Sequence, residues 1–251
     1  MSIIERTNPL NLQYKICVVT NASSPLGVVI CKTLLKANAL VLGIDTRPRD
    51  HSLNAGLGTH FQFEQVDIKE LETPKKIIEA SQEKFESLGG KFDALMNLVE
   101  KEDDDDDVAG IANLTKAIGN VMRETGQGSI ITVAPGSVNE VESQSKRQMI
   151  DFAKSLMQQF QDNSNSIRTN IIIPEAPSET QQSTLAYQEA QTHMTALIKT
   201  EEKSAIQSQQ TTTTTPAEFY KIANLVLFLA GGMSENLSGK IFGLDGSCRE
   251  L

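Results

Sequence analysis

Short apolar runs alternate along the chain with longer segments in which apolar residues recur every three or four positions. The short runs are rich in Ile, Val and Leu and are typical of strands, whereas the longer spacing is typical of amphipathic helices. The pattern predicts strands at Tyr14–Thr20, Leu40–Asp45, Phe61–Asp67, Phe92–Leu98, Ser129–Ala134, Ile167–Pro174 and Ile241–Asp245, and helices at Gly27–Ala37, Pro74–Leu88, Val108–Glu124, Ser143–Phe160 and Pro216–Ala230.

This alternation of strands and helices favours repeated βαβ units. Their crossovers are right-handed and place helices on both faces of a parallel sheet. The length of 251 residues suits one domain with a sizeable core. We therefore predict a doubly wound, Rossmann-type α/β domain over residues 1–251, with a variable substrate-loop or linker region at 183–215.

Composition narrows the class of partner. The net charge is −9 and no basic stripe is present, which argues against nucleic acid because its phosphates require clustered Lys and Arg. The longest apolar run, near 223–231, is too short to span a bilayer, so no membrane association is expected. The amino terminus lacks the pattern of a signal or transit peptide, and a cytoplasmic location is predicted.

Side chains that commonly bind metals are scattered. Cys17, Cys31 and Cys248 show no paired spacing and are expected to be buried, reduced thiols. The three histidines show no ligand spacing either, so no metal site is predicted. An acidic run at 100–107 is interpreted as a solvated loop that leads into a helix N-terminus, with a cation site or a basic peptide as the alternatives.

The segment TNASSPLG, Thr20–Gly27, joins the first strand to the first helix. A dinucleotide-binding protein carries its phosphate loop at this position. Asp45 ends the second strand, 18 residues after Gly27. An acid about 20 residues after such a loop accepts hydrogen bonds from the adenosine ribose and repels a 2′-phosphate. If a dinucleotide binds, NAD(H) is therefore expected in preference to NADP(H).

These residues and later motifs resemble the short-chain dehydrogenase/reductase family from end to end. The TGxxxGxG turn of the family corresponds to the Thr20–Gly27 loop, its NNAG motif to 97–100, its IRVNxxxPG strand to 167–175, and its TGxxxxVDGG pattern to the segment that ends at Ser247. The resemblance implies cofactor contacts from Thr20, Asn21, Ser23, Leu26, Gly27, Asp45, Asp67, Ile68, Asn97 and Lys146.

The resemblance also implies catalysis by a tyrosine, a lysine four residues later, a serine and an asparagine. Asn113 and Lys146 match the asparagine and the lysine, but Glu142 stands at the tyrosine position. Pro135 stands at the serine position, and Ser137 is the nearest substitute hydroxyl. A glutamate acts as a base here only if burial raises its pKa, and an ion pair with Lys146 is the simpler interpretation.

The phosphate loop departs from the family in the same direction. Asn21 replaces the first glycine, and Pro25 brings no backbone N–H to the pyrophosphate. These changes favour a non-catalytic family member that acts as a structural or regulatory subunit. The alternative hypothesis is an NAD(P)-dependent oxidoreductase with an altered active site that acts on a carbonyl or hydroxyl substrate.

The resemblance implies a homo-oligomer, or a hetero-oligomer with an active relative, paired through the helices at Val108–Glu124 and Ser143–Phe160. The second helix has apolar residues at helical spacing, which face either a partner or the chain's own sheet. They are Met149, Phe152, Ala153, Leu156, Met157 and Phe160.

Overall fold

The computed structural model describes residues 8–53, 58–86, 91–99, 105–134, 144–160, 166–174 and 216–250. Within these residues one eight-stranded sheet has the order β3-β2-β1-β4-β5-β6-β7-β8. Its strands are β1 Ile16–Thr20, β2 Leu40–Asp45, β3 Phe61–Gln65, β4 Ala94–Leu98, β5 Gln127–Val133, β6 Ser166–Ile173, β7 Lys240–Gly243 and β8 Cys248–Glu250.

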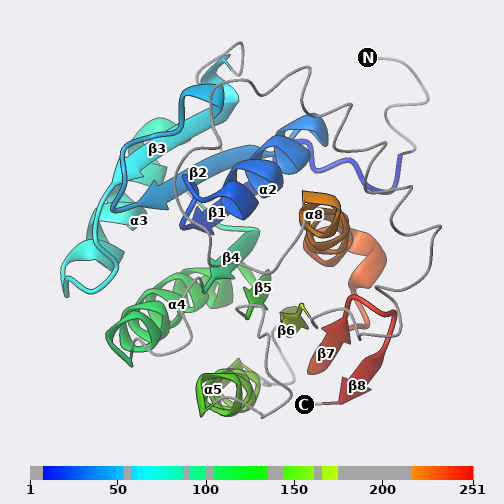
Figure 1. Cartoon of the computed structure of the whole chain (residues 1–251). Coiled ribbons are helices and arrows are strands. Elements are labelled where there is room, and N and C mark those ends of the chain that lie inside the picture. Colours follow the sequence, from blue (N-terminus) through cyan, green and yellow to red (C-terminus); the bar gives the residue numbers. More distant parts are fainter. Residues whose placement is uncertain are drawn as a thin grey trace.

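Helices cover both faces of the sheet (Figure 1). One face packs against α2 (Pro25–Lys36) and α8 (Pro216–Ala230), and the other against α3 (Thr73–Lys84), α4 (Asp105–Thr125) and α5 (Gln144–Phe160). Short 3-10 turns lie at His51–Leu53, Gly58–His60 and Gly232–Ser234. The doubly wound α/β prediction is therefore confirmed.

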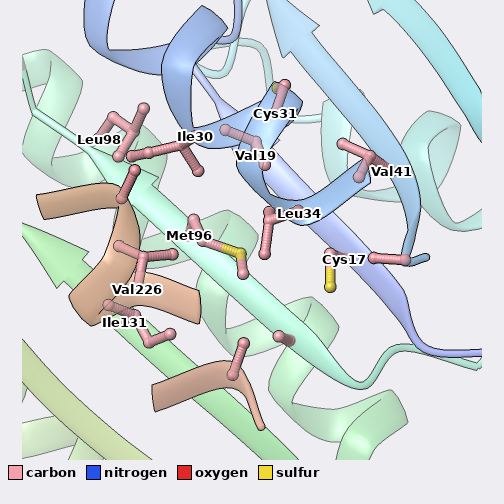
Figure 2. Close-up of a cluster of buried hydrophobic side chains, with 14 of the residues drawn as sticks. Cys17, Val19, Ile30, Cys31, Leu34, Val41, Met96, Leu98, Ile131 and Val226 are labelled. Atoms are coloured by element: carbon pink, nitrogen blue, oxygen red, sulfur yellow. The ribbon is translucent and has the colours of Figure 1, made fainter. Parts of the chain in front are cut away.

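The core beneath α2 and α8 consists almost entirely of aliphatic and sulfur-containing side chains (Figure 2). Ile30 and Leu34 from α2 meet Met96 from β4 and Val226 from α8, and all four are fully buried. Fully burying one such side chain contributes roughly 1.5–3 kcal/mol to folding. This packing fixes α2 against β1 and so fixes the loop between them.

Several predicted strands differ from the structure in their bounds, and one strand was missed. Tyr14 has a left-handed backbone (φ 65°) and is 63% exposed, so β1 begins only at Ile16. β3 ends at Gln65, because residues 66–68 turn toward α3. The strand β8 was missed because Cys248–Glu250 is short, polar and exposed, and it pairs antiparallel with β7 through a tight turn at Gly246 (φ 89°).

The acidic run contributes to α4, which begins at Asp105, inside the run. Carboxylates in the first turn of a helix interact favourably with its dipole. This supports the interpretation as a segment that leads into a helix N-terminus, and residues 100–104 lie outside the described part of the chain.

The apolar residues of α5 face the chain's own sheet. Ala153, Leu156 and Phe160 are buried, whereas Asp151 and Lys154 are exposed. α4 and α5 approach closely because Gly119 has no side chain: a Cβ there would lie 2.3 Å from the Phe160 ring. The home core therefore accounts for these three residues, and oligomerisation through these helices stays a prediction.

Candidate functional site

The strand order reverses between β1 and β4, which lie side by side although β2 and β3 separate them in sequence. Chain segments that leave the carboxyl ends of β1 and β4 therefore diverge to opposite faces of the sheet. In doubly wound sheets ligands bind at this point, in the crevice beyond the carboxyl ends of the strands. The predicted cofactor residues Thr20, Asp45 and Asn97 lie at or next to the carboxyl ends of β1, β2 and β4, and so at this edge of the sheet.

The loop after β1 is tied to the end of β4. The hydroxyl of Thr20 accepts a hydrogen bond from the Leu98 backbone N–H at 2.8 Å. Asn21 adopts the left-handed region (φ 49°) and donates from Nδ2 to the Leu98 carbonyl at 2.7 Å. Asn tolerates this backbone better than most residues, so it keeps the sharp turn that a glycine makes in the family pattern.

The loop then starts α2 with an N-cap. The Ser24 hydroxyl accepts from the Gly27 N–H at 2.9 Å, and Pro25 occupies the first turn, where it removes no helical hydrogen bond. Gly27 is needed because a Cβ there would lie 2.2 Å from the Asn21 carbonyl oxygen. The Leu26 N–H has no acceptor among the described residues. Leu26 thus provides a free donor at the positive end of the helix dipole.

Asp45 is the most fully engaged side chain at this edge. Its side chain is fully buried, and Oδ2 accepts from the Ser23 N–H at 2.9 Å. Oδ1 accepts from the Arg47 backbone N–H and from Arg47 Nε, and Oδ2 also accepts from Arg47 Nη2, each at 2.9 Å. The carboxylate that the sequence assigns to the adenosine ribose is therefore clamped by two residues of its own chain.

Ser23 is turned in the same direction. Its hydroxyl donates to the Pro48 carbonyl at 2.8 Å, in the segment that follows β2, and its N–H binds Asp45 at the end of β2. The cofactor contact predicted for Ser23 therefore requires a donor to change partner.

Asp67 and Ile68 follow β3 at the same edge. Asp67 Oδ1 accepts from the Lys69 N–H at 2.9 Å, which stabilises the turn that leads to α3. Ile68 lies against α4, because a Cβ at Gly110 would come within 2.7 Å of the Ile68 carbonyl oxygen. Both residues therefore follow β3 at the edge of the sheet where the resemblance predicts contacts with the adenine ring.

Asn97 lies at the end of β4 and is fully buried. Its Nδ2 donates to the Thr115 hydroxyl of α4 at 2.9 Å. Among the described residues its Oδ1 has no hydrogen-bond partner, and neither has the buried hydroxyl of Thr132 on β5, which is paired with Asn97. Two buried side chains on neighbouring strands thus each have a polar atom without a partner in the described part of the chain, although most buried polar groups are paired.

Of the four predicted catalytic residues, only Asn113 has a side chain in the described part of the chain. Asn113 lies on the exposed side of α4, whereas its neighbours Leu114 and Thr115 face the core. Lys146 lies in the first turn of α5, and its side chain is outside the description. Ser137 and Glu142 fall in 135–143, also outside the described residues.

Sequence reasoning missed two features of this edge. Arg47 was not singled out, although a basic side chain two residues after an acid that ends a strand can fold back onto it. Thr115 and Thr132 were missed because a single polar residue in an apolar run gives no indication of its partner.

The described residues contain no cluster of three or more metal-binding side chains. In the part of the chain that was searched, no helix is long and apolar enough to cross a membrane. Cys17 and Cys31 are buried as predicted, and this burial raises the pKa of both thiols far above its ordinary value. The expectation of burial was wrong for Cys248, which is exposed on the edge strand β8.

The arrangement fits a dinucleotide in part. The helix terminus, the free Leu26 N–H and the close packing at Gly27 suit a pyrophosphate. The adenosine-ribose position is different, because the acceptors of Asp45 are already engaged. Fold and loop together define a Rossmann-type domain with a dinucleotide-type phosphate loop.

Comparison with known proteins extends this description. No family model matches the sequence. The chain is 29% identical over 187 residues to short chain dehydrogenase ple7 of Rhodocybe pseudopiperita, covering 65% of this chain and 70% of that protein. It is 25% identical to short-chain dehydrogenase/reductase cdmF of Talaromyces verruculosus, covering 93% and 96%. It is 24% identical to the 3-oxoacyl-(acyl-carrier-protein) reductase FabG of Escherichia coli, covering 94% and 98%.

Among solved structures, one from Bacillus thuringiensis described as a 3-oxoacyl-reductase superposes with a TM-score of 0.63. It is 18% identical and covers 91% of this chain and 95% of that chain, which shows a shared fold. Two of these curated relatives match along more than nine tenths of the chain. In sequence and in fold the chain is therefore similar to short-chain dehydrogenases/reductases.

Proposed function

We propose that the chain is an oxidoreductase that binds a nicotinamide dinucleotide and acts on a carbonyl or hydroxyl substrate through an altered proton-transfer site. The observation that carries this proposal is the N-terminus of α2. There the left-handed turn at Asn21 and the close packing at Gly27 are present, and the Leu26 N–H has no acceptor among the described residues. An unpaired donor at a helix N-terminus favours an anion such as a pyrophosphate.

The relatives support the same reaction class. Their names describe dehydrogenases and reductases, among them a reductase that acts on 3-oxoacyl groups. Since the fold is shared, the proposed substrate class is a ketone or aldehyde, or the corresponding alcohol.

The proposed division of labour follows the chemistry. A nicotinamide dinucleotide, when bound, supplies or accepts hydride. The chain must bind and orient it, and must give a proton to the substrate oxygen or take one from it. In the absence of the family's tyrosine, Glu142 is the proposed proton-transfer residue, and Lys146, four residues later in the sequence, is its proposed partner. Ser137 is the proposed polar partner of the substrate oxygen, whereas Asn113 lies on the exposed side of α4 and is not assigned that role.

The test begins with turnover. We expect purified protein to oxidise NADH or NADPH at 340 nm with at least one small ketone or aldehyde from a panel, and Lys146→Ala to lower this rate at least tenfold. Lys154→Ala, on the exposed side of the same helix, is the matched control and should leave the rate unchanged. Absence of turnover together with absence of dinucleotide binding would refute the proposal.

A second candidate function rests on the sequence of the catalytic segment. Glu142 and Pro135 stand where the family carries its tyrosine and serine. These replacements favour a non-catalytic subunit that keeps the fold and binds a copy of itself or an active relative. In that case the protein elutes as a dimer or larger at micromolar concentration and shows no turnover.

One variant separates the two candidates. Glu142→Tyr restores the family's proton donor, and positioned general acids contribute roughly 100-fold to 10,000-fold to rates. If the wild-type protein already uses Glu142, the variant changes the pH profile of an existing activity. If the protein is non-catalytic but binds dinucleotide, the variant creates an activity that the wild type lacks.

A further inference from the structure

The side chain of Arg47 makes the principal side-chain contact of Asp45. Its guanidinium reaches both carboxylate oxygens, through Nε to Oδ1 and Nη2 to Oδ2, each at 2.9 Å. Parallel paired contacts of this kind are the strong, geometrically specific form of an arginine–carboxylate interaction.

The acceptor capacity of Asp45 is exhausted by these contacts. An ionised carboxylate has about four lone-pair sites. Oδ1 receives the Arg47 N–H and Nε, and Oδ2 receives the Ser23 N–H and Arg47 Nη2. A ribose hydroxyl that binds Asp45 must therefore displace one of these donors.

We infer that Arg47 is an internal competitor for the adenosine-ribose position: its guanidinium occupies the carboxylate that would otherwise accept the ribose hydroxyls, and it lowers the affinity for NAD(H). This inference rests on the proposed function, because it concerns the affinity of the same dinucleotide site. It assigns to Arg47 control of affinity rather than a part in catalysis.

The contact between Arg47 and Asp45 can break when the arginine side chain moves. The Arg47 side chain is 41% exposed, whereas that of Asp45 is fully buried, so the arginine is the partner that can move into solvent. Solvent screening keeps such half-exposed pairs weak. The two backbone donors, from Ser23 and Arg47, stay on the carboxylate when the guanidinium leaves. Release therefore frees one acceptor site on each oxygen without leaving the carboxylate unpaired.

The experiment measures the dissociation constant of NADH by calorimetry for the wild type, Arg47→Ala and Arg49→Ala. Arg49 is exposed and lies two residues further on, so its variant makes the same change in net charge at nearly the same place. We expect Arg47→Ala to bind NADH about tenfold more tightly than the wild type, a difference of 1.4 kcal/mol. Arg49→Ala should bind as the wild type does, or slightly more weakly.

Arg47→Lys provides a second variant that keeps the charge but lacks the planar fork. Its NADH affinity should lie between those of the wild type and Arg47→Ala, and thermal unfolding of the unliganded variants shows that each is folded. Equal or weaker binding by Arg47→Ala, with binding by the wild type, would overturn the inference and leave the proposed function standing. No binding by any of these proteins would overturn both.

Discussion

The carboxyl ends of β2 and β4 lie on the same edge of the sheet but satisfy their polar side chains differently. At β2, every acceptor site of Asp45 is taken by donors from Ser23 and Arg47. At β4, the Asn97 Oδ1 and the neighbouring Thr132 hydroxyl are buried without a partner among the described residues. The first region has completed its hydrogen bonds within the chain, whereas the second has not.

This difference has a consequence for binding. A polar ligand that approaches β2 exchanges one hydrogen bond for another, so its net gain is small. Where a buried acceptor lacks a donor, a new donor relieves a desolvation cost. The loop between β1 and α2 lies between the two regions, because Thr20 and Asn21 tie it to Leu98 while Ser23 ties it to Asp45.

The largest expected effect comes from removing the Asp45 carboxylate, whose acceptor sites are all engaged at the end of β2. Asp45→Ala leaves the Ser23 N–H and the Arg47 guanidinium without their acceptor. Removing one partner of a buried pair costs 3–5 kcal/mol, and the exposure of Arg47 reduces this to about 2 kcal/mol of unfolding free energy. Denaturant unfolding measures the loss. Asp151→Ala, at an exposed position of α5, is the control and should change stability by less than about 0.5 kcal/mol.

A pair of matched threonines sharpens the comparison. Both Thr20 and Thr132 are fully buried, but the Thr20 hydroxyl accepts from the Leu98 N–H, whereas the Thr132 hydroxyl has no partner among the described residues. Thr20→Val should therefore destabilise the protein by about 1–2 kcal/mol, because the Leu98 N–H loses its acceptor. Thr132→Val should be neutral or slightly stabilising. Equal losses in the two variants would show that the two regions do not differ.

The smallest effect is kinetic and concerns thiol reactivity. Burial raises the pKa of Cys31, which lies in α2 behind the loop, so almost no thiolate is present at pH 8. Cys248 is exposed and should react with a thiol reagent within minutes, whereas Cys17 and Cys31 should react only as the protein opens. Asp45→Ala should accelerate the labelling of Cys31 more than that of Cys17 if the hydrogen bonds of Asp45 hold the loop between β1 and α2 in place. Fast labelling of all three thiols in the wild type would contradict this packing.

Most of the fold could be predicted from the sequence because buried strands and amphipathic helices leave periodic apolar patterns. The strand Leu40–Asp45 and the helix Pro216–Ala230 have the predicted bounds, and the other predicted elements differ from the structure at their ends. The failures occur where the apolar pattern gives no information. The left-handed backbone at Tyr14 interrupts an apolar run. The polar hairpin strand β8 is exposed along its length and so has no apolar pattern.

The candidate site was less predictable. The position of Asp45 follows from spacing, but its partner depends on a turn that brings Arg47 back over the strand end. The direction of Asn113 depends on the rotation of α4 about its axis, which the neighbouring apolar residues fix only once the helix has docked. Side-chain hydrogen bonds of this kind depend on tertiary geometry and not on local sequence.

The most direct test of the central claim, that a dinucleotide binds at the start of α2, is a nuclear magnetic resonance titration of protein labelled with nitrogen-15 leucine. The account predicts that the Leu26 amide signal moves strongly as NADH is added, because its free N–H acquires a phosphate acceptor. Leu34, buried two turns further along the same helix, should move little. A Leu26 signal that stays in place at saturating NADH would contradict the account.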